Sequence, residues 1–413
     1  MTAETPKLEL ADILRDYTPA FLDAYGDTVS PAQHRVLRDL VRCRTAALGG
    51  HVEQCDGCGH QRIAYNSCRN RHCPRCQAAA RAAWLDERAA ELLPTDYFHV
   101  VFTLPSELAP LALQNQRLVY GTLLQASAHS LLQLARDPRH LGADIGFLAV
   151  LHTWGQNLHL HPHVHCVVPG GGLSPDGHRW VSCRPGFFLP VRPLGCLFRG
   201  KFLALLRRAY ERGLLGFHGQ QQPLAEPPAF DALLQTCRQK EWVVYAKPPF
   251  GGPEQVLKYL ARYTHRVAIS NARLVKVADD QVFFRWKDYA DGHQQKVMAL
   301  GAVEFIRRFL QHVVPSGFVR IRHYGLMGNR GRAENLARCR ALLLPGPGSG
   351  TGAAAPPPES SPEPPESKPT KAGMQPRCPA CGQGHMVIVG KIEPLRLGRA
   401  EAEVVGVAAP DTS

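Results

Sequence analysis

The 413-residue sequence predicts an α+β fold with more than one domain, and three observations lead to this prediction. Short runs of β-branched and aromatic residues are mixed irregularly with amphipathic helical patterns, which favours a central antiparallel sheet with flanking helices. Two Cys-x-x-Cys pairs at residues 55–76 predict a helical, zinc-binding N-terminal domain. A Pro- and Gly-rich segment near the C-terminus separates a short tail from the rest of the chain.

The first fifty residues are predicted to be helical. Ser30-Pro31 has the residue types of an N-cap and a first helical position, and apolar residues then recur at helical spacing as far as Val41. Gly49-Gly50 ends this element. After the cysteine-rich module, a further helix is expected from Pro74 to about Leu93.

From Tyr97 onward, strand patterns appear. Strands are expected in three apolar runs: FHVVFTLP at 98–105, FLAVLHTW at 147–154 and HVHCVV at 163–168. Amphipathic helices are expected around 197–215 and 255–263. A three-stranded antiparallel meander is expected in RVAIS at 266–270, RLVKV at 273–277 and QVFFRW at 281–286.

The C-terminal region begins with a segment of unusual composition. Residues 345–376 contain 10 Pro and 5 Gly among 32 residues. Such a segment buries too little apolar surface to offset the entropy of ordering, so it is predicted to be a disordered linker. The predicted divisions are therefore an N-terminal domain over 1–95, a larger α+β domain over 96–342, a linker over 343–376 and a tail over 377–413.

Charge and composition indicate the class of partner. The net charge is +13, and residues 258–340 alone hold 16 Lys or Arg against 6 Asp or Glu, interleaved with aromatic residues. Positive charge neutralises phosphates and aromatic faces stack on bases, so a nucleic-acid partner is favoured over a merely solvated basic surface. Without an apolar run of about 18 residues or a leader-like start, neither a membrane span nor a signal peptide is expected.

The cysteine module predicts a structural zinc site. Cys55, Cys58, Cys73 and Cys76 form two Cys-x-x-Cys pairs, and four thiolates close a tetrahedral site. Four other residues are available as substitute ligands: His51, His60, Cys68 and His72. The tail pair Cys378 and Cys381, with His385 nearby, is compatible with a small zinc knuckle or with inert thiols.

The sequence HLHPHVHCVV at 159–168 places histidines at alternate positions. In a strand, His163 and His165 share one face while Val164 and Cys166 point to the other. Imidazoles on one face can hold a metal ion. A polar strand with incidental histidines is the alternative, and only features elsewhere in the chain decide between the two.

The segment KPPFGGPEQVLKYLARYTHR at 247–266 contains such a feature. On a helix, Gln255, Tyr259 and Tyr263 follow one another at i, i+4 spacing along one face. Core packing is the ordinary explanation for such tyrosines, but here they lie in a strongly basic segment. A tyrosine hydroxyl, with a pKa of about 10, is a weak nucleophile and needs a metal ion to act on a phosphodiester. The two motifs therefore complement each other.

With these motifs the chain resembles a known family, the HUH rolling-circle transposases of the insertion-sequence-ninety-one type. The resemblance lies in His163-Val164-His165, in Tyr259-x-x-x-Tyr263 and in the stretches SCRNRHCPRCQ, YLARYTHR and FVRIRHYGL, and it covers about residues 9–330. It implies an HUH-endonuclease-like sheet carrying the histidines and facing a helix that carries two catalytic tyrosines. It also implies cleavage and rejoining of single-stranded DNA through 5′-phosphotyrosine intermediates, in rolling-circle transposition.

The resemblance further implies a catalytic Mg²⁺ or Mn²⁺ ion beside the structural Zn²⁺. His163 and His165 would bind the catalytic ion; Gln156 is the first choice for a third ligand, Gln255 is the second, and His161 is a possible ligand or proton shuttle. The expected partners are single-stranded DNA at element ends and target DNA, in the cytoplasm and associated with the nucleoid. Residues expected to contact DNA are Lys258, Arg262, Arg266, Arg320 and Arg322.

Three other functions are alternatives to transposition. A plasmid-type rolling-circle replication initiator would use the same chemistry, but the long zinc module favours a transposase. A non-catalytic zinc-finger DNA-binding protein would use the histidines as a second structural zinc site. A zinc hydrolase is disfavoured because the sequence has no His-Glu-x-x-His motif.

Overall fold

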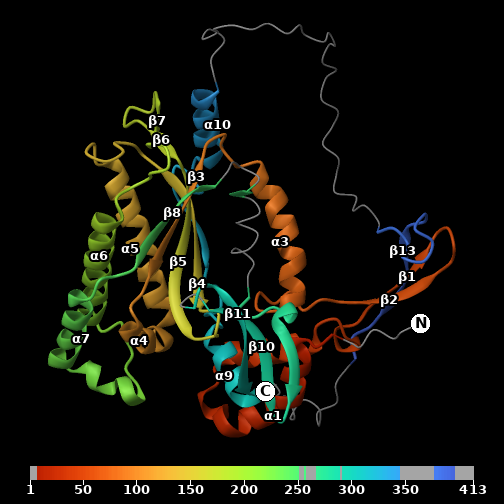
Figure 1. Cartoon of the computed structure of the whole chain (residues 1–413). Coiled ribbons are helices and arrows are strands. Elements are labelled where there is room, and N and C mark those ends of the chain that lie inside the picture. The colour runs from red at the N-terminus through yellow and green to blue at the C-terminus, as the bar shows by residue number, and fades with distance from the viewer. Residues whose placement is uncertain (1–6, 251–254, 257–266, 289–290, 345–375, 396–413) are drawn as a thin grey trace, which may run out of the picture. The chain divides into compact units, whose positions relative to one another are not determined.

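The computed structural model describes residues 7–250, 255–256, 267–288, 291–344 and 376–395 (Figure 1). The chain divides into two compact units, and each consists of two separate stretches of the sequence. One holds residues 1–41 and 69–343, and the other holds 42–68 and 344–413. This division differs from the one predicted from the sequence, because a strand of the tail hydrogen-bonds to a strand of the cysteine module.

The larger unit contains a five-stranded sheet, which confirms the predicted central antiparallel sheet. Every neighbouring pair in it is antiparallel. The strands, in spatial order, are β12 (Ile321–Gly325), β4 (Gly146–Trp154), β5 (Leu160–Pro169), β3 (Tyr97–Thr103) and β8 (Val244–Phe250). All three apolar runs expected after Tyr97 form strands, because their β-branched and aromatic side chains pack well on a pleated surface.

Helices cover one face of this sheet (Figure 1). They are α4 (Ala109–Gln114), α5 (Gln116–Arg136), α6 (Val191–Glu211) and α7 (Pro227–Gln239). Phe102 and Val164 from the strands and Leu124 and Phe198 from the helices are fully buried in the shared core. The helix predicted around 197–215 corresponds to α6. It begins earlier than predicted, with Pro190 as its N-cap and Val191 as its first residue.

The opposite face of the sheet has a smaller apolar cluster, on which Trp84 of α3 (Pro74–Ala89) packs. The prediction that a helix starts at Pro74 is confirmed, although α3 ends before Leu93. The predicted helix of the first fifty residues is also confirmed as α1 (Leu10–Tyr25) and α2 (Pro31–Arg42).

The larger unit also holds a three-stranded antiparallel meander, and one strand of the prediction was wrong. Its strands are β9 (Leu274–Ala278), β10 (Gln281–Asp288) and β11 (Gln294–Gly301). The described part of RVAIS, residues 267–270, is not a strand, because β11 supplies the third strand and pairs along the whole of β10. The apolar residues of RVAIS are instead buried outside the sheet, Ile269 completely.

Further elements of this unit are short or lie beside these two sheets. They are β6 (Gly171–Leu173), β7 (Trp180–Ser182), α9 (Ala302–Gln311) and α10 (Arg332–Leu343). In the described part of the chain, no helix is long and apolar enough to span a membrane.

The smaller unit is a three-stranded antiparallel sheet. Its spatial order is β13 (Met386–Ile392), β1 (Gly50–Cys55) and β2 (Gln61–Tyr65). The central strand therefore pairs with its own hairpin partner on one side and with the C-terminal tail on the other. The sequence predicted the tail as a separate segment because no local pattern reveals a strand partner so far away in the chain.

Candidate functional site

The histidine strand is arranged as the pleat of β5 predicts. Val164 and Cys166 are fully buried in the core beneath the helices. His163 and His165 therefore belong to the opposite face of the sheet. We call this side, with the histidines described next, the histidine face.

A third histidine joins them from the neighbouring strand. His152 of β4 is directly opposite His163 of β5 in the antiparallel register. One ring nitrogen from each of His152, His163 and His165 lies within 4.8 Å of the others, so the three imidazoles could hold one metal ion. His152 was not among the ligands predicted from the sequence. Leu148, Val150 and His152 occupy alternate positions of one strand, which indicates that they share a face. Only the strand register puts His152 opposite His163.

Hydrogen bonds orient two of these imidazoles. His163 Nδ1 lies 2.6 Å from the carbonyl oxygen of His161, and this contact requires Nδ1 to carry the proton and donate it. His165 Nδ1 lies 2.7 Å from Nε2 of His99, which is on β3 and almost completely buried. In each ring Nδ1 makes this contact, and Nε2 is the ring nitrogen that could bind a metal ion. His161 contributes its backbone carbonyl to this arrangement, and its own ring is outside the group of three.

The predicted tyrosine helix is described only at its first residues. Val256 is completely buried on the histidine face, in a cluster with Val150 and Val167 of the adjacent strands. Gln255, the second choice for a metal ligand, is exposed. Tyr259 and Tyr263 lie outside the described residues, as do the predicted DNA contacts Lys258, Arg262 and Arg266. Their roles stay predictions.

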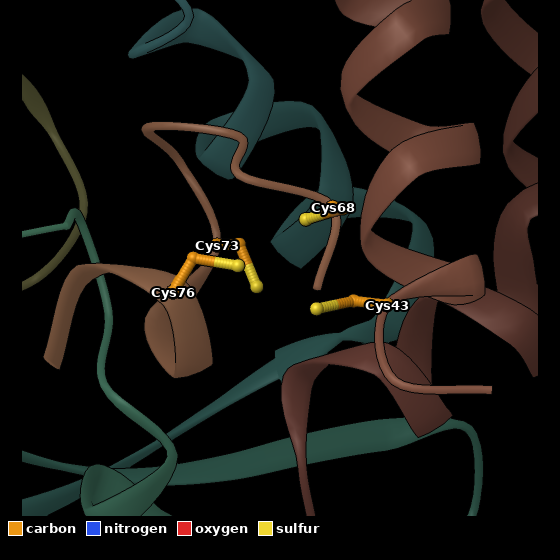
Figure 2. A group of neighbouring side chains, drawn as sticks. All are labelled: Cys43, Cys68, Cys73 and Cys76. Atoms are coloured by element: carbon orange, nitrogen blue, oxygen red, sulfur yellow. The ribbon is translucent and has the colours of Figure 1, made fainter. Parts of the chain in front are cut away.

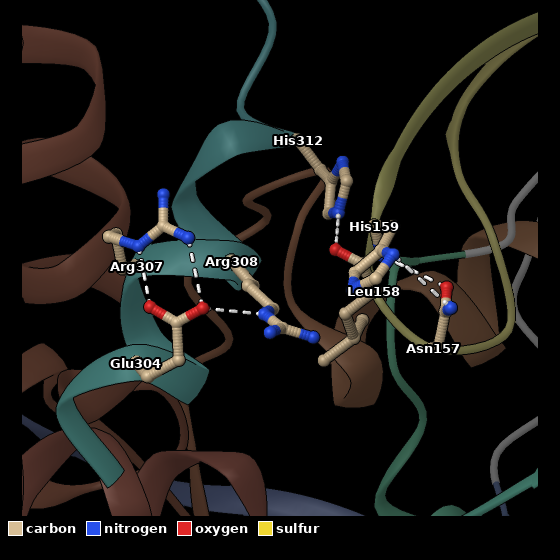
Figure 3. Close-up of polar contacts among 7 residues, drawn as sticks. All are labelled: Asn157, Leu158, His159, Glu304, Arg307, Arg308 and His312. Atoms are coloured by element: carbon tan, nitrogen blue, oxygen red, sulfur yellow. Dashed lines mark hydrogen bonds and ion pairs between the residues drawn. The ribbon is translucent and has the colours of Figure 1, made fainter. Parts of the chain in front are cut away.

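The turn that leads into the histidine strand is held by His312 at the end of α9 (Figure 3). Leu158 in this turn has a φ of 61°, in the left-handed region that a leucine rarely adopts. His312 Nε2 donates to the carbonyl oxygen of Leu158 at 3.1 Å, while its Nδ1 accepts from Thr153 Oγ1 at 3.2 Å. Burial lowers the pKa of His312 to about 4, so the ring is neutral, as one donor and one acceptor nitrogen require.

Two further contacts fix the same turn. The Asn157 side-chain oxygen accepts the backbone N–H of His159 at 3.2 Å (Figure 3). The backbone carbonyl of Gln156 accepts a hydrogen bond from the guanidinium of Arg273. Gln156 thus belongs to the turn after β4, and its proposed role as the third ligand stays a prediction beside His152.

The charged residues near this turn are partly paired. The carboxylate of Glu304 contacts Arg307 and Arg308, each at 2.6 Å, and these hydrogen bonds lower its pKa to about 2 (Figure 3). Of the predicted DNA contacts, Arg320 is only 9% exposed, and burial lowers its pKa to about 10. Its guanidinium is thus mostly withdrawn from the surface, which argues against a direct phosphate contact. Arg322 donates to the carbonyl oxygen of Val319 at 3.1 Å, and its DNA contact stays a prediction.

The cysteines are grouped differently from the sequence-based assignment. Cys73 and Cys76 lie with Cys43 and Cys68, whose sulfur atoms all fall within 4.8 Å of one another (Figure 2). We call these four the Cys43 group. Cys55 and Cys58 instead lie with Cys378 and Cys381 of the tail. The predicted set of Cys55, Cys58, Cys73 and Cys76 therefore does not form one site. Cys68, one of the substitute ligands that the sequence offers, belongs to the Cys43 group.

The regrouping has a simple cause. A Cys-x-x-Cys pair brings its own two sulfur atoms together locally, but the partner of each pair is chosen by the folding of the chain. Cys43 directly follows α2 and shows no Cys-x-x-Cys spacing, so no local pattern marked it.

Known proteins similar to this chain agree on one family. A family model described as a putative transposase matches residues 146–334, and one described as a transposase zinc-binding domain, of the IS91 type, matches residues 13–104. The chain is 57% identical to the putative transposase y4qJ of Sinorhizobium fredii, over 92% of this chain and 94% of that protein.

A second relative is more distant. It is the transposase for insertion sequence element IS801 of Pseudomonas savastanoi pv. phaseolicola, 27% identical over 75% of this chain and 74% of that protein. No solved structure matches the chain.

Proposed function

We propose that this chain, which belongs to the family of IS91-type transposases, cleaves and rejoins single-stranded DNA through 5′-phosphotyrosine intermediates in rolling-circle transposition. The sheet would then be the palm of an HUH-endonuclease-like domain. Its substrates would be single-stranded DNA at the element ends and target DNA.

The observation that supports this proposal best is the composition of the histidine face. Three imidazoles from two adjacent strands converge there, and hydrogen bonds direct Nε2 of His163 and His165 away from the backbone and His99. Val256, which is followed three residues later by Tyr259, is buried on this same face. This placement supports the predicted approach of the tyrosine segment to the histidines.

The residues of the histidine face fit a divalent transition-metal ion. His152, His163 and His165 would hold it, and when bound it would polarise a phosphate oxygen and offset the charge that develops during cleavage. Mg²⁺ is bound in proteins almost entirely through oxygen ligands. A site with three imidazoles therefore favours Mn²⁺ over Mg²⁺, the two ions expected from the sequence.

The proposed chemistry needs one tyrosine for each strand joint. The oxygen of Tyr259 or Tyr263 attacks the scissile phosphorus and loses its proton. The bond between phosphorus and the 3′ oxygen breaks, and that oxygen takes up a proton to become a free 3′-hydroxyl. The strand remains linked through a 5′-phosphotyrosine, whose later attack by a 3′-hydroxyl rejoins the DNA without hydrolysis. The second tyrosine allows a second joint while the first persists.

The zinc-binding domain would serve as the structural part of the enzyme. We assign the Cys43 group to its zinc ion, since four thiolates close a site with no position open for a substrate. The zinc would stabilise this domain and take no part in cleavage.

The decisive experiment looks for the covalent joint. The purified chain is incubated with single-stranded oligonucleotides from the element ends and Mn²⁺, then denatured. We expect a protein–DNA adduct that survives denaturation in the wild type and in each single variant, Tyr259→Phe and Tyr263→Phe, but not in the double variant. Phenylalanine keeps the ring and removes only the nucleophilic oxygen, so folding is preserved.

The possible outcomes separate the alternatives. An adduct that persists in the double variant would refute the two-tyrosine mechanism. DNA binding without any adduct in the wild type would instead favour a non-catalytic DNA-binding protein. A single variant that forms the adduct but fails at complete transposition would support the need for two covalent protein–DNA joints. A replication initiator can complete its replication cycle with different requirements, so this result would favour a transposase.

A further inference from the structure

The second group of cysteines, outside the histidine face, is built from two turns of the same kind. One has the sequence CDGCG at 55–59 and the other CPACG at 378–382. In both, the glycine after the second cysteine has a positive φ, 72° at Gly59 and 66° at Gly382. Each of these glycines donates its N–H to the carbonyl oxygen of the first cysteine, at 3.1 Å and 2.9 Å respectively.

Backbone N–H groups also point at the sulfur atoms. Gly57 and Cys58 donate to Sγ of Cys55, each at 3.4 Å. In the tail, the N–H of Ala380 contacts Sγ of Cys378 and the N–H of Gly384 contacts Sγ of Cys381, again at 3.4 Å. Donors placed around sulfur stabilise thiolates, the form in which cysteine binds a metal ion.

The distances between the sulfur atoms match a tetrahedral zinc site. Sγ of Cys55 lies 3.7 Å from Sγ of Cys381, and Sγ of Cys58 lies 3.7 Å from Sγ of Cys378. Four sulfur atoms about 2.3 Å from one ion are separated by about 3.8 Å in a tetrahedron. The same distance is far longer than the roughly 2.05 Å of a disulfide bond.

The surrounding backbone holds the two turns against each other. His385 donates its N–H to the carboxylate of Asp56 at 2.8 Å, and Asp56 donates its N–H to the carbonyl of His385 at 3.0 Å. A Cβ added to Gly384 would lie 2.5 Å from Sγ of Cys55, so only glycine allows this approach. Beyond the turns, β13 pairs with β1 from Met386 to Ile392.

From these contacts we propose a second structural zinc site, formed by Cys55, Cys58, Cys378 and Cys381, which fastens the C-terminal tail to the hairpin of β1 and β2. We call it the tail site. Each turn supplies two thiolates, and neither turn alone completes the tetrahedron. The site is separate from the Cys43 group and does not depend on the proposed DNA chemistry.

Metal content tests the tail site directly. Zinc per chain is measured by mass spectrometry of the native, full-length protein. We expect two zinc ions in the wild type and one in Cys378→Ser and in Cys381→Ser. The matched control is Cys196→Ser, since Cys196 is an exposed cysteine outside both groups, and it should retain two ions. The proposal is overturned if the tail variants hold as much zinc per chain as the wild type.

Gly384→Ala provides a variant that retains all four cysteines. Because the added methyl group would collide with Sγ of Cys55, we expect this variant also to lose one zinc ion. The control must be a glycine that can be replaced by alanine without strain or collision. Gly213 is unsuitable because its φ is positive, whereas a Cβ added to Gly200 of α6 would have no heavy atom within 4 Å. Gly200→Ala should therefore retain both ions. Equal zinc content in Gly384→Ala and Gly200→Ala would contradict the proposed packing.

A cleavable chain tests the fastening of the tail. A protease site is inserted between residues 355 and 360, the chain is cut, and the pieces are separated by size under native conditions. We expect the tail to remain with the larger piece in the presence of zinc and to separate after a chelator is added. In Cys378→Ser it should separate without chelator. A tail that leaves the zinc-loaded wild type would overturn the proposal, whether or not the protein cleaves DNA.

Discussion

The histidine face and the tail site are both candidate metal sites, but the chain assembles them differently. The three histidines come from β4 and β5, which are adjacent in the sequence and in the sheet. The four cysteines of the tail site come from opposite ends of the chain, with Cys58 and Cys378 separated by 320 positions. One site depends on strand register within a sheet, and the other on the association of two distant turns.

The ligands suit different tasks. Four thiolates fill every position of a tetrahedral zinc site and leave no place for a substrate. Three imidazoles leave coordination positions open, which a phosphate oxygen or water can occupy. The comparison therefore predicts that loss of a histidine affects chemistry, whereas loss of a cysteine affects folding.

The largest effect is expected from removing a ligand of the histidine face. His163→Ala or His165→Ala should abolish cleavage of single-stranded DNA while sparing its binding. We expect binding to rest mainly on the basic residues of 258–340 and on the zinc-binding domain. Binding should still weaken steeply with added salt, because phosphate contacts release counterions. The exposed neighbour His161 supplies a matched control, since His161→Ala keeps the carbonyl that orients His163. Cleavage at the wild-type rate by either ligand variant would show that the histidine face is not the catalytic centre.

A cysteine of the Cys43 group should instead affect stability. In Cys73→Ser a three-ligand site remains, and because metal binding is coupled to folding, we expect a loss on the order of 4 kcal/mol in the free energy of unfolding. DNA binding should weaken, while adduct formation persists below the unfolding temperature. Denaturant titration with zinc analysis measures this, with Cys196→Ser as the control. A zinc-free variant of unchanged stability would remove the contrast between the two kinds of site.

A graded effect is expected from His99, which contacts His165 and not the proposed ion. His99→Phe keeps a ring in the buried position but removes the nitrogen 2.7 Å from His165 Nδ1. Loss of such a supporting partner lowers metal affinity by about 10–100-fold. The Mn²⁺ concentration for half-maximal cleavage should rise accordingly, and saturating Mn²⁺ should restore the rate. An unchanged Mn²⁺ dependence would reduce His99 to a packing residue.

The last effect is confined to acidic pH and concerns the turn held by His312. Its pKa is lowered from 6.5 to about 4 by burial, so the unfolded chain takes up the proton first as the pH falls. Its stabilising contribution is therefore complete above pH 6.5 and is lost as the pH falls toward 4. Between pH 6.5 and 4, the free energy of unfolding of His312→Gln should therefore fall less than that of the wild type, by up to about 3 kcal/mol. The control is His129→Gln, which makes the same replacement at an exposed histidine. If the free energy of unfolding changed with pH equally in His312→Gln and His129→Gln, the role assigned to His312 would be contradicted.

Local patterns alone determined much of this protein. Alternation in HVHCVV put His163 and His165 on one face, because the pleat of a strand depends only on neighbouring residues. Pro31 and Pro74 marked helix starts for the same local reason. The Cys-x-x-Cys spacings indicated metal-binding turns, and the landmark stretches indicated the transposase family that the known relatives confirm.

Only the tertiary structure decided which of these local units meet. His152 became a candidate ligand through the register of β4 against β5, and a shift by one residue would have turned it to the other face. Cys55 and Cys58 found partners in Cys378 and Cys381 rather than in the nearer Cys73 and Cys76. The strand pairing of β13 with β1 set that choice. Spacing along the chain specifies each turn, whereas pairing between turns follows from packing and hydrogen bonds across the whole fold.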